Sequence, residues 1–335
     1  MGRRKRATLA DLSAELGISI QTISKALRGR PGMSEETRGR IMRTAYLRGY
    51  MSSAQARELV RQGIAPYPSY RLRFVLVQSH QSLTYNRLLT AGLQERLGQY
   101  EHRLDCYVLE ENLSEVEFEE WAQTRNLTHA DGLLIAPRLT SGSMEEQLLK
   151  YRVPKVLINY PRPLTQVDSV IWDVYEAVCM AVDRLARAGH RRLLYIGDIA
   201  AQRGYMHRWQ AYQEMMAALG EPALRATADD FEAAFLRHRP TALLVGIDED
   251  CDQITTALDR LGIRVPEDCS LVALRNAPPE EALPISRPQL MIREAGYEAA
   301  DRILWRIAHP NAPHQHTRIR GGFHDGRTIA APQRT

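Results

Sequence analysis

The residues best suited to recognise another molecule lie on one face of a short segment near the amino end. Read as a helix that follows Ser19, this segment has an outer face made of Ile20, Gln21, Ser24, Lys25 and Arg28, with Thr22 toward its flank. An amide, hydroxyls, cations and one aliphatic side chain match what base pairs and phosphates offer in the major groove of DNA. A helical hairpin in an ordinary core domain would instead carry pairs of Glu and Lys there. The segment is therefore interpreted as a DNA-recognition helix.

Two short helices separated by a tight turn must position this face. Thr8 followed by Asp11 is a variant of the capping box and predicts the start of the first helix. Gly17 ends that helix, and Ser19 is placed to cap the second. Apolar residues recur at helical spacing and predict one small core, made of Leu9, Leu12, Leu16, Ile23, Ala26 and Leu27. A third helix, capped by Ser34, is expected to close this core with Ile41, Met42, Ala45 and Tyr46.

Residues 8–59 resemble the headpiece of the lactose-repressor (LacI/GalR) family of bacterial transcription factors. The matching phrases are Thr8-Leu9-Ala10-Asp11-Leu12, Gly17-Ile18-Ser19, Gln21-Thr22-Ile23-Ser24-Lys25, Ser34-Glu35-Glu36-Thr37-Arg38, Gly49-Tyr50 and Ala54-Gln55-Ala56-Arg57-Glu58-Leu59. The resemblance implies an all-α helix-turn-helix headpiece over residues 1–51, which binds a near-palindromic operator as part of a homodimer.

The residues of this headpiece have distinct expected roles. Gln21 and Lys25 are expected to read base edges, with Ile20 in apolar contact beside them. The side chains expected to hold phosphates and set the register are Thr8, Ser19, Thr22 and Ser24. Ile20 and Lys25 stand where the family's namesake has Tyr and Arg, so the namesake's operator sequence is not assumed for this chain.

Residues 52–61 form a short helical pattern that resembles the hinge helix of the family. Nine or so residues are too few to hold a helix alone in water. In the family this helix is ordered when two copies pack together on the operator, and a Leu from each copy kinks the DNA through the minor groove. Leu59 matches that position, with Ala56 and Arg57 beside it. The alternative is an ordinary interdomain connection, and residues 62–72 are expected to be a linker in either case.

Charge is unevenly distributed along the 335 residues. The net charge is +4, but residues 1–62 hold 13 Lys and Arg against 5 Asp and Glu, so the excess of positive charge lies in the headpiece. This distribution indicates a polyanionic partner for the amino-terminal part. No apolar segment follows the basic residues 3–6, so no signal peptide is expected, and no membrane-spanning run occurs. The four cysteines form no CxxC pair and are expected to be buried thiols in a reducing cytoplasm.

Residues 73–335 alternate between short apolar strands and amphipathic helices. Strands are predicted at 74–77, 104–109, 132–135, 156–158, 193–197, 242–245 and 270–274, and helices at 88–97, 116–124, 144–151, 176–188, 208–219, 251–261 and 293–308. Such alternation predicts parallel sheets covered on both faces. The pattern runs through two similar cycles, so we predict two doubly wound α/β subdomains, with crossovers near 160–175 and 280–325. This body resembles the periplasmic sugar-binding proteins in fold, and the resemblance to the lactose-repressor family implies that it binds an effector and dimerises.

A ligand cleft is expected where the carboxyl ends of the strands of the two subdomains meet. The candidate effector-binding residues, taken from strand ends and matched family positions, are Ser79, Tyr85, Trp172, Asp173, Arg208, Asp248 and Arg275. Arg208 falls where the family has an effector-contacting Arg, and the Trp172 ring could stack on a sugar. The alternatives are an ion pair that serves structure for Arg208 and subdomain packing for Trp172.

Two departures from the family pattern bear on the effector. Many sugar-binding members have Asn where this chain has Ile247, and Asp where it has Arg275. Replacing a carboxylate by a guanidinium favours an anionic effector such as a sugar acid or a sugar phosphate. Two alternatives are that Arg275 pairs with Asp248 or Glu249, or that the pocket is degenerate.

The sequence thus predicts a regulator, most simply a repressor, whose operator affinity is controlled by a small molecule. The alternatives are a solute-binding protein or an enzyme on the same α/β scaffold. No catalytic, metal or cofactor motif occurs. The acidic segment 248–252 lacks the Gly and terminal Glu of a calcium loop. No heptad pattern follows Pro332, so no tetramer through a carboxyl-terminal coiled coil is expected.

Overall fold

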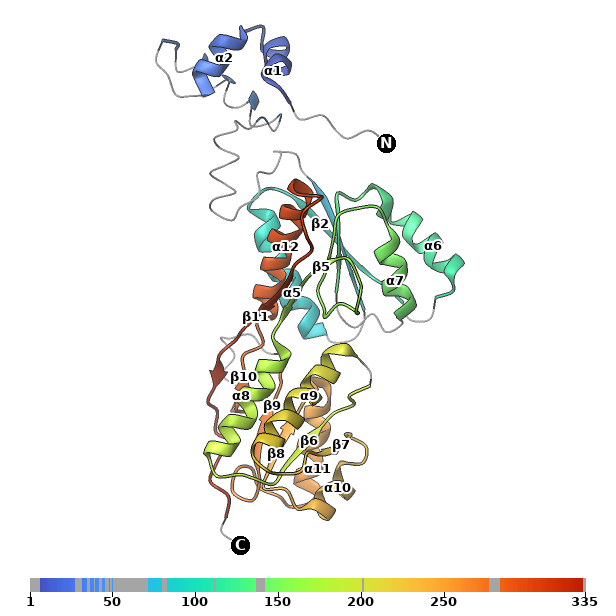
Figure 1. The fold of residues 1–335 in the computed structure, drawn as a ribbon, viewed down its shortest axis with the longest axis vertical. Coiled ribbons are helices and arrows are strands. Elements are labelled where there is room, and N and C mark those ends of the chain that lie inside the picture. Colours follow the sequence, from blue (N-terminus) through green and yellow to red (C-terminus); the bar gives the residue numbers. More distant parts are fainter. Residues whose placement is uncertain are drawn as a thin grey trace.

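A computed structural model describes most of the chain (Figure 1). It describes residues 7–27, part of residues 32–50, and residues 72–333 except 80–82, 111–112, 137–141, 201 and 277–283. Arg28, the predicted hinge helix and most of the predicted linker lie outside the described residues.

The headpiece begins with α1 (Leu9–Leu16) and α2 (Ile20–Leu27). The predicted capping box is confirmed, since the Asp11 amide donates to Thr8 Oγ1 at 3.2 Å and the Thr8 amide donates to Asp11 Oδ2 at 2.7 Å. Gly17 ends α1 in the left-handed conformation, with φ +65°. Glycine is the residue most often found in this conformation at the end of a helix. The predicted core forms around five buried residues, Leu12, Ile23, Ala26, Ile41 and Ala45.

The first subdomain is built on a six-stranded parallel sheet in the order β11-β5-β4-β3-β1-β2. Its strands are β1 (Arg73–Gln78), β2 (Arg103–Val108), β3 (Gly132–Ile135), β4 (Lys155–Leu157), β5 (Asp168–Trp172) and β11 (His316–Ile319). One face is covered by α5 (Leu83–Gly98) and α12 (Ile292–Ala308), and the other by α6 (Glu115–Thr124), η1 (Leu127–His129) and α7 (Gly142–Lys150).

Helices α5 and α12 lie side by side along the first sheet (Figure 1). Glycines make their close approach possible. A Cβ added to Gly92 would lie 1.8 Å from the Arg293 carbonyl oxygen, and one added to Gly296 would lie 2.3 Å from that of Leu89. Because no side chain fits at either position, these glycines fix how closely the two helices pack.

The second subdomain has a four-stranded parallel sheet in the order β7-β6-β8-β9. Its strands are β6 (Leu193–Ile196), β7 (Leu224–Ala226), β8 (Ala242–Val245) and β9 (Ser270–Ala273). One face packs against α8 (Val174–Arg187) and α9 (Arg203–Ala218), and the other against α10 (Phe231–His238) and α11 (Cys251–Arg260), with η2 (Asp248–Asp250) before α11. A small antiparallel pair joins β10 (Arg287–Pro288) to β12 (Phe323–His324).

The chain passes between the subdomains three times. It leaves the first sheet after β5 to form α8, returns from β10 to α12, and leaves again between β11 and β12. The predicted fold class, a helix-turn-helix headpiece on an α/β body of the periplasmic-binding-protein type, is confirmed. Within the part of the chain that the structure describes, no helix is long and apolar enough to cross a membrane.

Several elements were not predicted from the sequence, namely α10, β5, β7, β10, β11 and β12. Strand β5 opens with two polar residues, Asp168 and Ser169, yet every residue in it is buried. Arg306 explains this, because its Nε and Nη2 donate to the Asp168 carboxylate at 2.6 and 3.1 Å from α12. Ser169 pairs with His316 of β11 at 2.9 Å. Partners distant in sequence therefore satisfy polar groups that no local apolar pattern marks as strand.

Candidate functional site

The outer face of α2 presents the predicted DNA-facing side chains to solvent. Gln21 and Lys25 are exposed, Thr22 and Ser24 are half-buried, and Ile20 is 46% exposed. The opposite face packs into the headpiece core through Ile23 and Ala26. An exposed isoleucine between polar neighbours offers an apolar contact of the kind that a thymine methyl group makes.

Hydroxyl groups gather at the amino end of α2. Ser19 Oγ accepts a hydrogen bond from the Thr22 amide at 3.2 Å and lies 2.8 Å from Thr22 Oγ1. Ser34 and Thr37 repeat the same arrangement, with distances of 3.1 and 2.8 Å. Amides and hydroxyls at a helix amino end form a favourable environment for a phosphate group.

Two features of neighbouring residues shape the surroundings of the carboxyl end of α2. Arg38 donates through Nη1 to the Ala26 carbonyl at 3.2 Å. The Lys25 ammonium lies over Gly32, since a Cβ added to Gly32 would be 2.7 Å from Lys25 Nζ. Gly32 also has φ +105°, a conformation that other residues rarely adopt. The Arg38 hydrogen bond and the left-handed backbone of Gly32 were not predicted, because these residues lie outside the apolar residues that recur at helical spacing. Four predicted DNA-contacting residues, Arg28, Ala56, Arg57 and Leu59, lie outside the described residues.

A cavity lies where the carboxyl ends of the two sheets meet. Three predicted effector residues line it together: Tyr85 from the start of α5, Trp172 from the end of β5, and Arg208 from α9. Its other lining residues are Asn159, Tyr160, Ile171, Val174, Gln202, Gly204, Tyr205 and Asn276. These eight residues were not predicted from the sequence, although Asn159, Tyr160 and Asn276 follow strands β4 and β9 closely.

Aromatic rings surround the Arg208 guanidinium in this cavity. Its Cζ lies 5.1 Å from the Trp172 ring centroid and 4.8 Å from that of Tyr205. The buried Arg208 also donates through Nη1 to the Gly246 carbonyl. Burial, together with the Asp173 charge, raises the pKa of Tyr160 to about 12. The Tyr160 hydroxyl is therefore neutral, and it accepts a hydrogen bond from the Val174 amide at 3.3 Å.

Four predicted effector residues lie outside the cavity lining. Arg275 forms ion pairs with Asp248 at 3.2 Å and with Asp252 at 3.3 Å. Its guanidinium is therefore already paired, and it does not provide a free cation for an anionic effector. Asp173 caps α8 by accepting from two backbone amides at 3.1 Å. Ser79 is buried at the end of β1. These side chains support the walls of the cleft or the sheet beneath it.

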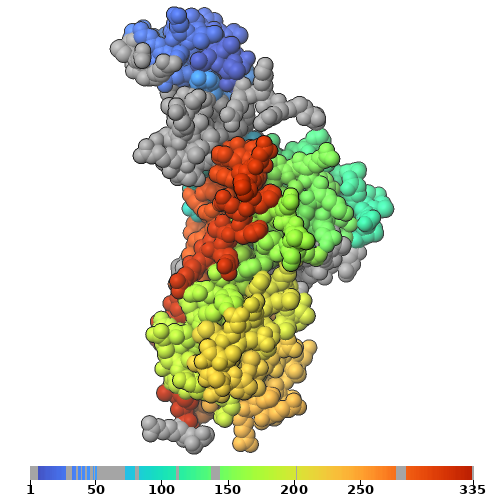
Figure 2. All heavy atoms as spheres, in the orientation of Figure 1, coloured from blue at the N-terminus to red at the C-terminus, as the bar shows by residue number. Residues whose placement is uncertain are grey.

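The cleft is closed in this structure. The cavity has a volume of about 30 Å³, which is about the share of one water molecule in the liquid. The space-filling view shows the two subdomains in contact along one face (Figure 2). A small-molecule site usually has about 300–1,000 Å³, so a ligand enters only if the walls separate.

An ion pair joins the subdomains beside the cavity. Arg203 at the start of α9 donates through Nη2 to both carboxylate oxygens of Glu145 on α7, at 2.8 and 2.6 Å. Its Nε donates to the Tyr160 carbonyl at 2.7 Å, and the Tyr160 and His207 rings lie 4.2 Å apart. The Glu145 side chain is only 5% exposed. These contacts hold the closed arrangement.

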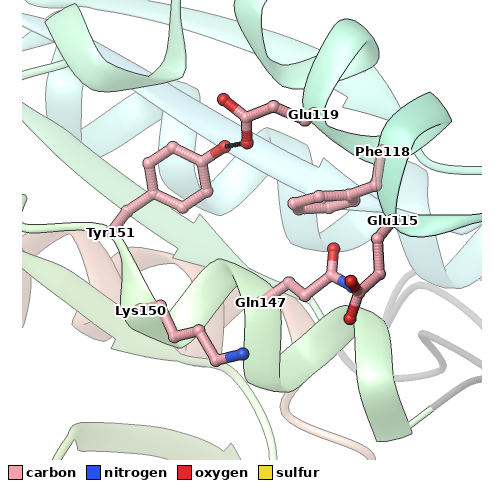
Figure 3. Close-up of a pocket in the computed structure, with 6 residues that line it drawn as sticks. All are labelled: Glu115, Phe118, Glu119, Gln147, Lys150 and Tyr151. Atoms are coloured by element: carbon pink, nitrogen blue, oxygen red, sulfur yellow. Dashed lines mark hydrogen bonds between the residues drawn. The ribbon is translucent and has the colours of Figure 1, made fainter.

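A larger hollow of about 390 Å³ lies between α6 and α7 (Figure 3). It is lined by Glu115, Phe118, Glu119, Gln147, Lys150 and Tyr151. The Tyr151 hydroxyl donates to Glu119 at 3.2 Å. This groove contains none of the predicted effector residues, which distinguishes it from the smaller cavity between the subdomains.

Known proteins share this architecture. The family described as periplasmic binding protein-like domain matches residues 182–329. The HTH-type transcriptional regulator CelR of Thermobifida fusca is 27% identical over 336 residues, which cover 92% of this chain and 96% of CelR. Catabolite control protein A of Priestia megaterium is 22% identical over 298 residues, which cover 84% of this chain and 86% of that protein.

A solved structure of the lac repressor dimer, bound to operator and the anti-inducer ONPF, shares the fold. Its TM-score is 0.66 at 18% identity, over 98% of this chain and 100% of that chain. The similarity thus spans the headpiece as well as the two-subdomain body.

Proposed function

We propose that this chain is a DNA-binding transcriptional repressor of the lactose-repressor (LacI/GalR) family, controlled by a small-molecule effector. The observation that carries this proposal is the outer face of α2, which exposes Gln21, Lys25 and Ile20 on a helix that the headpiece core holds firmly. The similarity to CelR and to catabolite control protein A covers most of this chain and most of each relative. This favours a regulator over a solute-binding protein or an enzyme on the same scaffold.

The headpiece binds one half of a near-palindromic operator, and a homodimer binds both halves. Gln21 pairs with an adenine and Lys25 with a guanine, each contributing about 1–3 kcal/mol of discrimination. Ile20 makes an apolar contact beside them. The hydroxyls at the amino ends of the headpiece helices, those of Thr8, Ser19, Thr22 and Ser24, hold phosphates and set the register.

The domain boundaries follow from this proposal. Residues 1–51 form the headpiece, 52–61 a hinge helix, 62–72 a linker, and 73–335 the effector-binding and dimerisation body. In the hinge, Leu59 enters the minor groove at the operator centre with Ala56 and Arg57 beside it. An apolar wedge there unstacks one base step and bends the DNA.

The cleft between the subdomains is the effector site. A sugar, or a sugar acid or phosphate, contacts Tyr85, Trp172 and Arg208 and changes the angle between the subdomains. That change alters the spacing of the two hinges in the dimer and so the affinity for DNA. By linkage, operator DNA changes the affinity for the effector by the same factor.

A gel-shift experiment on a library of palindromic duplexes tests the DNA-binding roles. We expect Lys25→Ala and Leu59→Ala to weaken binding to the selected duplex, because one removes a base contact and the other the minor-groove wedge. Lys150→Ala is the matched control, since Lys150 is an exposed lysine on α7 of the body. Binding that neither Lys25→Ala nor Leu59→Ala weakens would contradict the assigned roles.

A further inference from the structure

The indole of Trp172 carries a hydrogen-bond donor that the protein does not use. Trp172 ends β5 and lines the cavity between the subdomains, where it is 3% exposed. Its Nε1 is buried and has no hydrogen-bond partner among the described residues. Trp121 shows the usual arrangement, because its Nε1 donates to the Val108 carbonyl at 3.2 Å. A buried N–H group without a partner is costly, so such a group at a ligand site indicates an acceptor that arrives with the ligand.

The positive charge of Arg208, which lies beside Trp172, indicates what kind of acceptor the ligand carries. The Arg208 guanidinium lies 5.1 Å from the Trp172 ring centroid, so both donors belong to the same part of the cavity. Among the described residues that line the cavity, none carries a carboxylate. Acids near the cavity are already engaged, since Asp173 caps α8, Asp248 pairs with Arg275, and Glu145 pairs with Arg203. The cavity therefore presents one positive charge and several neutral polar groups to a ligand.

We infer that the effector carries an oxyanion, a carboxylate or a phosphoryl group, which accepts hydrogen bonds from Trp172 Nε1 and from Arg208. This inference rests on the proposed role of the cleft as the effector site. An anionic acceptor adds the attraction between opposite charges to its hydrogen bond with a guanidinium, and a neutral acceptor does not. The oxyanion is therefore a better partner for Arg208 than the neutral Gly246 carbonyl to which Arg208 now donates.

The rest of the cavity fits the remainder of such a ligand. Tyr85, Tyr160 and Tyr205 offer ring faces, and Asn159, Gln202 and Asn276 offer amides. Ring faces pack against the C–H groups of a sugar, and amides donate to or accept from its hydroxyls. A cationic ligand is disfavoured, because it would place a second positive charge next to Arg208 in a buried site. The ligand class is thus an acidic or phosphorylated polyhydroxyl compound.

Indole N–H signals in nuclear magnetic resonance test this inference directly, because the chain has only four tryptophans. The full-length protein is labelled with ¹⁵N at its indoles, and Trp172→Phe assigns the Trp172 signal. Inorganic phosphate and acetate are titrated against chloride at constant ionic strength. We expect phosphate, acetate or both to shift the Trp172 signal while the Trp305 signal stays in place. A response to phosphate alone indicates a phosphoryl group, and a response to acetate alone indicates a carboxylate.

Larger probes and matched variants complete the test. Calorimetry compares the binding of glucose 6-phosphate, gluconate and glucose. We expect at least one of the two anions to bind more tightly than neutral glucose. Trp172→Phe keeps an aromatic ring but removes the indole N–H group, so the affinity of the protein for the bound anion should fall about tenfold. Trp305→Phe, on α12 outside the cavity, should leave it unchanged.

Two results would overturn the inference. One is a Trp172 signal that phosphate, acetate, glucose 6-phosphate and gluconate all leave in place, and the other is glucose that binds more tightly than both glucose 6-phosphate and gluconate. Operator binding is measured on the same samples. A protein that selects an operator yet fails the anion test refutes the ligand class and leaves the proposed DNA-binding function intact.

Discussion

The outer face of α2 and the lining of the cleft hold their polar side chains in different ways. On α2, Gln21 and Lys25 project into solvent from one short helix whose other face forms the core. In the cleft, Trp172 and Arg208 are buried and come from different subdomains. A surface that reads DNA can thus vary at little cost to folding. A buried site depends on partners that must all be in place before a ligand arrives.

The largest expected effect tests how much the body depends on buried pairs. Asp168→Ala removes the partner of the buried Arg306 guanidinium, and we expect a loss of about 3–5 kcal/mol in the free energy of unfolding. Urea denaturation of the full chain measures it. Asp183→Ala is the control, because its pair with Arg187 is exposed on both sides, at 46% and 76%, and its loss should leave the urea midpoint nearly unchanged. Equal midpoints for the two variants would contradict the contrast.

Lys25→Ala tests the other side of the comparison. Because Lys25 is exposed, we expect no measurable change in the urea midpoint. Discrimination at one base pair of the operator half-site should fall by about 1–3 kcal/mol. Competition binding with single-base variants of the selected operator measures this loss. A variant that unfolds more easily, or that weakens binding equally for every duplex, would show that Lys25 does not read a base.

The ion pair across the cleft gives a smaller expected effect. Glu145→Gln removes the charge that holds Arg203, so the subdomains should separate more often. Hydrogen exchange followed by mass spectrometry should show several-fold faster exchange in residues 202–208 than in the unmodified chain. Glu146→Gln is the adjacent control, because Glu146 is exposed and pairs with Arg162 within the first subdomain. Equal exchange in the two variants would show that the pair does not restrain opening.

The smallest expected effect concerns pH. His190 is buried against Thr241, Ser270 and the Ala330 carbonyl, at 3.0, 2.9 and 2.8 Å. Burial lowers its pKa below the ordinary value of 6.5. The unfolded chain therefore takes up a proton near pH 6.5 while the folded chain does not, so stability falls as the pH drops below about 6.5.

Thermal unfolding between pH 7.5 and 5.5 measures this dependence. We expect His190→Gln to lower the unfolding temperature at pH 7.5 and to weaken its decline toward pH 5.5. His129→Gln is the control, because His129 is exposed, and it should keep the full decline. A decline that is identical in all three proteins would exclude His190 as its source.

The same comparison explains what could be predicted from the sequence. The headpiece follows local rules, since a cap at Thr8, a glycine at position 17 and apolar residues at helical spacing are enough to predict α1, α2 and their outer face. Strands with continuous apolar runs, such as β3 and β8, were likewise predicted at their observed bounds. Strand β5 was not predicted, because its polar start is buried only through Arg306, more than a hundred residues away.

The cleft was predicted in part for the same reason. Tyr85, Trp172 and Arg208 could be identified because they lie at strand ends or at matched family positions. Arg275 looked equally suitable in the sequence, but Asp248 and Asp252 hold it outside the cavity lining. Asn276, the next residue, lines the cavity instead. Which of two adjacent side chains faces a ligand depends on pairing across the fold.

Selection of duplexes from a random DNA pool by the purified full-length protein tests the central claim most directly. The account predicts enrichment of a near-palindromic sequence whose half-sites lose their selectivity at one position in Lys25→Ala. A protein that enriches no sequence over bulk genomic competitor, with or without phosphate, acetate and sugars present, would contradict it.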